Sequence, residues 1–259
     1  MEHRLAHMTS QEVETAIADG RMVILPTGAT EAHGPHLPID TDTHQAEHMA
    51  VELAKRVGAV AAPPVAYGIS KTFEHFPGTL SLSVPTYQQM IYELAAALIR
   101  QGFRHVFLLN GNRPNGTSND AVARRLIDDL DEAFDFMVTA VSYWEPGAAK
   151  IHSLRKSKVG GMGHGGEFET SFQLATRPEL VHGDRLEDVD APLVRWDLVA
   201  PVAPARSYAR RPSPKRGHPS IFGDPGPASA ASGKAFIEAA LDGLAEMVKE
   251  IGASYGERR

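Results

Sequence analysis

The chain alternates short apolar runs with amphipathic segments of helical spacing, and this alternation restricts its fold more than any other feature. Runs that are short and apolar enough for buried strands cover residues 22–25, 60–65, 105–109 and 136–143. Segments with helical spacing cover residues 9–19, 43–57, 85–100, about 120–132 and 235–251. Strands that alternate with helices predict an α/β layered fold with a largely parallel sheet.

The chain length fits one folding unit. With 259 residues, the chain is near the upper limit for a single hydrophobic core, so we expect one domain over residues 1–259. Residues 201–228 are rich in proline, arginine and serine. We expect them to form a long irregular excursion, a type of segment that often serves function or assembly.

Composition argues against several classes of protein. A formal net charge of -6 disfavours non-specific nucleic-acid binding, which requires a basic face. No apolar run approaches the roughly 20 residues of a membrane span, and the N-terminus lacks the apolar core of a secretory signal. We therefore expect a cytoplasmic protein that acts on a small molecule. Because the chain has no cysteine, a metal ion would be held by His, Asp, Glu or Asn side chains or by water.

The segment after the first predicted strand carries the strongest site pattern. Parallel sheets bind ligands in the loops that leave the carboxyl ends of their strands. Glu31 and His33 are two residues apart, so in an extended segment they project to the same side. A loop bent by its prolines can bring Asp42 back against them. Carboxylate and imidazole together suit zinc, manganese or iron, so we predict a metal site here; the simpler alternative is a solvated polar loop.

A second cluster lies in the glycine-rich segment 163–171. His164 could act as a general acid–base, because the pKa of an unperturbed histidine lies near neutrality. Glu167 and Glu169 point the same way if the segment is extended, but a helix can instead begin there. The alternative without a function is a glycine turn with acids at the favourable end of a helix.

Two further patterns allow more than one interpretation. The loop after the strand at 105–109 contains Asn112 and Arg113, which either make turns or bind substrate. Residues 44–48 match the inverted zinc-protease pattern His-x-x-Glu-His, with both histidines on one helix face. We favour helix-surface histidines over a protease site, with His44 near enough to Asp42 to support it.

These clusters, in this order, resemble the creatininase (creatinine amidohydrolase) family. The matching segments are residues 26–38, 75–82, 109–111, 142–144, 164–171 and 222–225, together with Asp42. The resemblance runs from residue 21 to about residue 235. It implies a three-layer α/β/α sandwich with a mostly parallel central sheet, which assembles as a homo-oligomer, usually a hexamer, and holds one or two zinc, manganese or iron ions.

The resemblance also implies roles for individual residues. Glu31, His33 and Asp42 are then metal ligands, and Asp42 bridges the ions where two bind. Glu169 is implied as a ligand or as support for one, and His164 as the catalytic acid–base. Trp144, with Tyr143 beside it, is implied as a substrate contact.

The chain departs from the family pattern in the loop after the third strand. Asn112 stands where the family has a metal-binding histidine, and Pro114 stands where creatininase has a ligating glutamate. Asparagine is a weak ligand for transition metals. At least one ion is therefore expected to be lost, weakened, or held instead by His44, Glu167 or Glu169. Creatinine is not the expected substrate.

The function expected from the sequence is a metal-dependent amidohydrolase that cleaves a C–N bond in a small or cyclic molecule. Two alternatives stay open. One is a metal-dependent enzyme that breaks a carbon–carbon bond in a keto-sugar of the inosose type, a chemistry that the family also includes. The other is a relative without catalytic activity.

Overall fold

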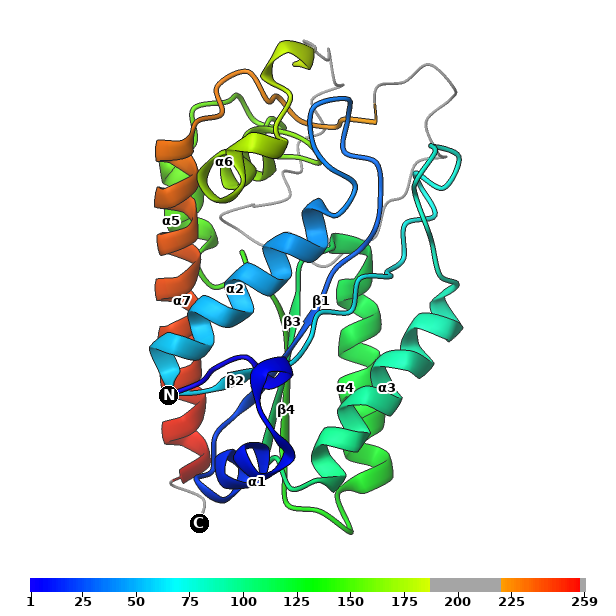
Figure 1. Ribbon diagram of the computed structural model, residues 1–259, viewed down its shortest axis with the longest axis vertical. Coiled ribbons are helices and arrows are strands. Elements are labelled where there is room, and N and C mark those ends of the chain that lie inside the picture. The colour runs from blue at the N-terminus through cyan, green and yellow to red at the C-terminus, as the bar shows by residue number, and fades with distance from the viewer. Residues whose placement is uncertain (187–219, 257–259) are drawn as a thin grey trace.

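A four-stranded sheet lies at the centre of the computed structural model, which describes residues 1–186 and 220–256. Its strands are β1 (Val23–Thr27), β2 (Val60–Ala61), β3 (His105–Asn110) and β4 (Met137–Ser142). They pair in the order β2-β1-β3-β4, and every pair is parallel (Figure 1). The predicted parallel sheet is confirmed, and its strands all end at the same edge.

Helices cover both faces of this sheet, as the three-layer prediction requires (Figure 1). One face is covered by α2 (Thr41–Val57), α5 (Ala148–Leu154), α6 (Glu167–Thr176) and α7 (Ala230–Gly256). The other face is covered by α1 (Ser10–Ala18), α3 (Val84–Arg100) and α4 (Gly116–Leu130). Short 3-10 turns lie at Leu5–His7, Arg113–Asn115, Pro178–Leu180 and Gly183–Arg185.

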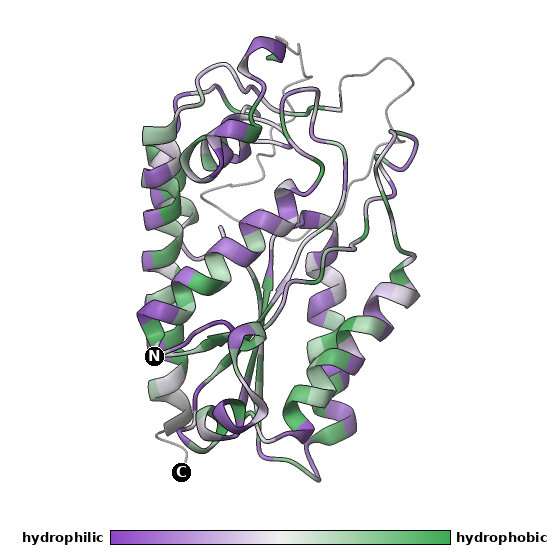
Figure 2. Cartoon of the chain, viewed as in Figure 1, coloured by the Kyte–Doolittle hydropathy of each residue, from purple (hydrophilic) through white to green (hydrophobic). Residues whose placement is uncertain are grey.

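Each strand contributes to two hydrophobic cores. In β1, Ile24 packs into the core on the α2 side, whereas Val23 and Leu25 pack into the core on the α3 side. Successive side chains of a strand point to opposite faces, so a strand buried on both faces has to be apolar throughout. Figure 2 shows the strands in the colour of hydrophobic residues. This double burial explains why the two central strands, β1 and β3, appear in the sequence as apolar runs.

The boundaries differ from prediction where proline or polar side chains intervene. Strand β2 ends at Ala61 rather than at residue 65, because Pro63 and Pro64 have no N–H to donate to a neighbouring strand. Helix α4 begins at Gly116 rather than near residue 120. The asparagines of this region looked like turn formers, but Asn119 lies inside α4 and donates to Thr27 Oγ1 at 3.0 Å.

Two more differences concern the second half of the chain. Helix α5 was not predicted. Helix α7 is longer than residues 235–251, because small residues at its start pack closely on α6 without an apolar period. Of the predicted excursion at 201–228, residues 201–219 lie outside the described residues. None of the helices in the described part of the chain is long and apolar enough to span a membrane.

Two glycines of α7 test the close packing of this helix on α6. An alanine Cβ at Gly233 would lie 1.9 Å from the Ser171 carbonyl oxygen, whereas at Gly252 nothing lies within 4 Å. We expect Gly233→Ala to destabilise the protein by about 1–3 kcal/mol through overpacking. Gly252→Ala should stabilise it by up to about 1 kcal/mol through helix propensity. Urea unfolding of both variants measures the difference, and equal effects would contradict this account of the helix contact.

Candidate metal centre

The loop between β1 and α2 brings three predicted ligands together. It turns at Gly34, which has φ of +76°, and it is closed by the Glu31 N–H donating to the Ile39 carbonyl at 2.9 Å. Asp42 follows in the first turn of α2. Its Oδ1 lies 3.2 Å from His33 Nε2. The predicted approach of Asp42 to His33 is therefore present.

Helix α6, which lies far from this loop in the sequence, supplies a fourth side chain. Glu169 Oε2 lies 3.6 Å from His33 Nε2 and accepts the Gly165 N–H at 2.6 Å. Because the helix begins at Glu167, the two glutamates point in different directions. Glu167 instead accepts the N–H groups of Lys156 and Ser157, at distances from 2.7 to 3.0 Å, and ties down the preceding loop.

His164 completes the cluster just before α6. Its Nδ1 lies 3.4 Å from Glu31 Oε1, and its Nε2 lies 2.8 Å from the Ala32 carbonyl oxygen. The ring stacks on Phe73 at 4.2 Å between centroids and lies 4.0 Å from the His33 ring. We call Glu31, His33, Asp42, His164 and Glu169 the acid–imidazole cluster.

Burial sets the electrostatics of this cluster. Glu31, Asp42 and Glu169 are only 2–3% exposed, and burial is the first cause of a raised pKa for each of them. The pKa of Glu31 rises to about 8, helped by the nearby Asp42, and that of Glu169 rises to about 7. Burial also lowers the pKa of His164 well below its usual value. Each group thus resists charge in the absence of a counterion.

The donor atoms fit a divalent transition metal. Glu31 Oε2, His33 Nε2 and Asp42 Oδ2 are buried without a hydrogen-bond partner. Two overlapping triads each offer three ligand atoms within 4.8 Å of one another: Glu31, His33 and His164, and His33, Asp42 and Glu169. Buried polar atoms normally have partners, so unpaired oxygen and nitrogen atoms that converge indicate a missing cation. Mixed carboxylate and imidazole donors suit zinc, manganese or iron.

Outer contacts hold the ligand-bearing elements in place. Arg177, just after α6, donates to both carboxylate oxygens of Asp40 at 2.7 and 2.8 Å. Asp40 precedes the helix that carries Asp42, so this pair connects the two halves of the cluster. The hydrogen bonds that Asp40 accepts from Arg177 lower the pKa of this carboxyl group. His36, fully buried, pairs through Nε2 with the Thr170 hydroxyl at 3.0 Å.

The four predicted substrate residues lie outside this cluster, and their role stays a prediction. The Asn112 side chain is buried and donates to the Ile69 carbonyl at 3.3 Å and to Asn115 Oδ1 at 3.2 Å. Arg113 is exposed in the neighbouring turn. Tyr143 and Trp144 are buried in the core on the α2 side, where the tyrosine hydroxyl donates to a glutamine of α2.

The inverted zinc-protease pattern does not form a metal site in the described residues. The rings of His44 and His48 both lie edge-on to Phe172, and His44 Nε2 pairs with the Thr176 hydroxyl at 2.9 Å. Glu47 pairs with Arg4 at 2.5 Å. Neither histidine belongs to the triads above. His44 and Glu167, which were considered as replacements for the family's metal-binding histidine, thus make other contacts. Glu169, the third residue considered, lies in the acid–imidazole cluster.

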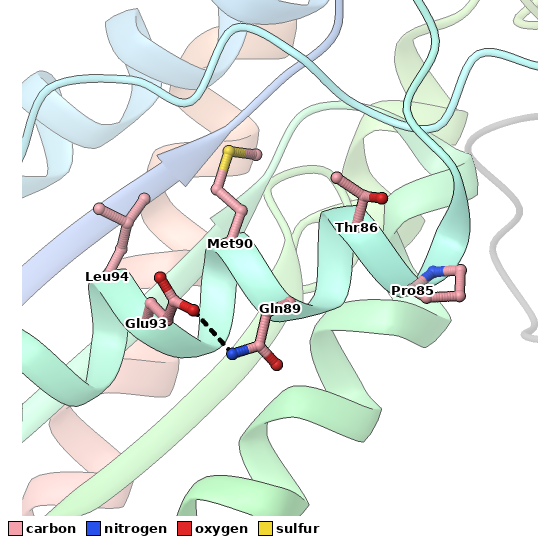
Figure 3. A pocket seen from close by; sticks show the side chains of 6 residues that line it. All are labelled: Pro85, Thr86, Gln89, Met90, Glu93 and Leu94. Carbon is pink, nitrogen blue, oxygen red and sulfur yellow. Dashed lines mark hydrogen bonds between the residues drawn. The ribbon is translucent and has the colours of Figure 1, made fainter.

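A separate hollow on the outer side of α3 lacks the features of a metal or catalytic site. Figure 3 shows its lining, which comes from one helix: Pro85, Thr86, Gln89, Met90, Glu93 and Leu94. Gln89 donates to Glu93 at 2.7 Å, so its polar groups are already paired with each other. The hollow contains neither a histidine nor a converging set of acids.

Sequence reasoning missed the side chains that surround His164. Phe73 stacks on its ring, Phe222 lies 6.5 Å from it, and the Phe222 N–H donates to the His164 carbonyl at 2.8 Å. Phe222 lies in a segment that resembles the family pattern, but nothing in its spacing indicated a contact with residue 164. Phe73 had no such signal, since it lies in a loop without periodicity.

The fold and the cluster define a parallel α/β protein with a buried candidate metal centre at its strand ends. The family model described as creatinine amidohydrolase, of the creatininase family, matches residues 6–248. The chain belongs to this family, which the sequence pattern had predicted.

Individual relatives agree with this assignment. A creatinine amidohydrolase of Pseudomonas putida is 31% identical over 95% of this chain and 96% of its own. A mycofactocin precursor peptide peptidase of Mycolicibacterium smegmatis is 30% identical over 95% and 90%. A 3-dehydro-scyllo-inosose hydrolase of Thermotoga maritima is 28% identical over 94% and 82%.

Solved structures are similar over the same length. A crystal structure of creatinine amidohydrolase superposes with a TM-score of 0.81 at 30% identity, covering 95% of this chain and 96% of that one. Among the similar structures are a manganese form of creatininase and a mutant of the Zn-Zn type, with TM-scores of 0.79 and 0.80. At 31% identity each, they cover 96% of this chain and 98% of their own.

Metal binding should depend steeply on pH. A metal ion binds the carboxylate form, but burial raises the pKa of Glu31 to about 8 and that of Glu169 to about 7 in the metal-free protein. Protons therefore compete with the ion below these values. We expect the apparent zinc affinity to rise by about tenfold per pH unit for each proton displaced, between about pH 6 and pH 7.

Chelator competition at several pH values measures this affinity. Calorimetry in two buffers of different ionisation enthalpy measures the protons released. Zinc binding that is independent of pH and releases no protons would contradict the protonated state of the buried acids.

Proposed function

We propose that this chain is a metal-dependent hydrolase that cleaves the C–N amide bond of a small substrate, either cyclic or open-chain. The observation that carries the proposal is the acid–imidazole cluster. Its donor atoms converge from the loop after β1 and from the residues around the start of α6, and Glu31 Oε2, His33 Nε2 and Asp42 Oδ2 have no hydrogen-bond partner. A divalent ion bound there would polarise a substrate carbonyl and make water a stronger nucleophile.

The residues of the chain have two tasks in this proposal. Glu31, His33, Asp42 and Glu169 would hold the metal ion. Hydrolysis adds water to the carbonyl carbon, breaks the C–N bond and moves a proton to the leaving nitrogen, so it needs a proton carrier. The resemblance to the family implied His164 for that role. The bare Nδ1 of His164 can take a proton or a metal ion, but not both at once.

The choice of a C–N bond is supported by the relatives. The names of two of the three relatives above, an amidohydrolase and a peptidase, denote cleavage of such a bond. The third is named a hydrolase of 3-dehydro-scyllo-inosose, which keeps the keto-sugar alternative in the test. Creatinine is the less expected amide, because Asn112 and Pro114 stand in the loop after β3 at the two positions where the resemblance implies metal ligands.

Removing one cluster carboxylate should abolish turnover. We expect Glu31→Gln to lower kcat/KM by on the order of 10³-fold, since metal-ion stabilisation of a transition state amounts to several kcal/mol. The assay would compare the metal-loaded protein on cyclic amides, short peptides and keto-inositols, with bound metal measured by elemental analysis.

Glu47→Gln is a matched control, because it removes the same charge from the outer side of α2. It should keep both metal and turnover. Turnover of amides by wild type and its loss in Glu31→Gln would support the proposal, whereas turnover of keto-inositols alone would favour the carbon–carbon alternative. Wild-type protein that binds none of zinc, manganese and iron would overturn both and leave a relative without catalysis.

A further inference from the structure

Both histidines of the cluster are anchored in the same way. His33 Nδ1 lies 3.1 Å from the Glu31 carbonyl oxygen, and His164 Nε2 lies 2.8 Å from the Ala32 carbonyl oxygen. A backbone carbonyl can only accept a hydrogen bond, so each of these ring nitrogens carries the proton. The opposite nitrogens, His33 Nε2 and His164 Nδ1, are then bare in the neutral rings. Histidines that bind metals are typically fixed by such a bond from the other ring nitrogen.

The His164 ring is held so that it cannot present its other nitrogen to the cluster. Phe73 stacks on one face at 4.2 Å with an interplanar angle of 13°, and the His33 ring lies at 4.0 Å. The hydrogen bond to the Ala32 carbonyl fixes the remaining in-plane rotation. A flipped ring would leave that buried carbonyl without its donor, at a cost of about 1–3 kcal/mol. Nδ1 is therefore the nitrogen that faces the acids.

The distances inside the cluster match ligand-to-ligand separations. Ligand atoms about 2.1 Å from a tetrahedral ion are about 3.4 Å from each other. His164 Nδ1 lies 3.4 Å from Glu31 Oε1, and His33 Nε2 lies 3.2 Å from Asp42 Oδ1 and 3.6 Å from Glu169 Oε2. His164 is therefore about as close to Glu31 as His33 is to Asp42 and Glu169.

We propose that His164 is a metal ligand through Nδ1 and not the proton carrier. This assignment rests on the proposed metal centre and deepens it. The loop after β3 offers no imidazole, since the Asn112 amide is turned toward Ile69 and Asn115. His164 supplies a second imidazole from the α6 side instead. With His164 bound to the ion, the proton for the leaving nitrogen has to come from another group.

X-ray absorption of the zinc-loaded wild-type protein tests this assignment without any variant. Scattering from the outer atoms of an imidazole ring reports how many histidines bind the ion. In protein loaded with one zinc per chain, we expect two histidines on the ion. A single histidine would overturn the assignment and leave the metal centre intact, whereas protein that takes up no zinc, manganese or iron would refute the proposed function itself.

Variants give a second test with affinity as the readout. We expect His164→Gln to lower zinc affinity at least about tenfold, because even the loss of a ligand's supporting partner has an effect of that size. His105→Gln is the matched control: His105 also pairs with a threonine hydroxyl, that of Thr139, but it lies at the start of β3, away from the cluster, and belongs to neither triad. Its affinity should stay within about twofold of wild type. Unchanged zinc affinity in folded His164→Gln would overturn the assignment.

Imidazole rescue separates a ligand from a structural side chain. In cobalt-loaded His164→Gly, the visible absorption of the ion should differ from that of wild type, and added imidazole should restore it. A proton carrier that does not touch the ion would leave the cobalt spectrum unchanged both on substitution and on rescue, and that result would also overturn the proposal.

Discussion

Burial of three carboxyl groups beside two imidazoles is the constraint on which the rest of this structure depends. Moving a charge out of water costs several kcal/mol even after the protein relaxes, and a group without a partner is relieved by losing its charge instead. The raised pKa values of Glu31, Asp42 and Glu169 express this tendency. A cation among these acids offsets that cost and restores their charge. The scaffold therefore has to hold these acids side by side, although burial and their mutual repulsion both oppose their charged forms while the ion is absent.

A buried polar network below the cluster gives the scaffold that rigidity. Tyr87 donates to Asn119, which donates to Thr27 at the end of β1. Asn115 accepts the Ile69 N–H and donates to the Gly28 carbonyl, both at 2.9 Å. Helices α3 and α4 are thereby fixed to the loops that leave β1 and precede α3. Fully paired buried networks of this kind specify one arrangement, because each unpaired member would be costly.

The sequence predicted the fold and named all five residues of the acid–imidazole cluster as site residues, although their roles stay predictions. Strands buried on both faces must be apolar, so their runs and the parallel sheet were readable, and Glu31, His33 and Asp42 lie within twelve residues of one another. Which side chains join from residues 164–169 depends on where α6 begins. The start at Glu167 aims Glu169 at the cluster and Glu167 away from it. For the asparagines after β3 the sequence left turn formation and substrate binding open, because a local pattern cannot show hydrogen bonds to distant loops.

The cluster is also the point where separate parts of the chain meet. The Gly34 N–H donates to the Ser220 hydroxyl at 3.0 Å, and the Phe222 N–H donates to the His164 carbonyl. Residues after 220 thus hold both the ligand loop after β1 and the segment before α6 from outside. An ion would join the same two segments from inside through side chains. Because these two contacts join uncharged groups, they can set the spacing of the ligands, but they cannot neutralise their charge. Placement of the ligands and compensation of their charge therefore come from different sources, the fold and the ion.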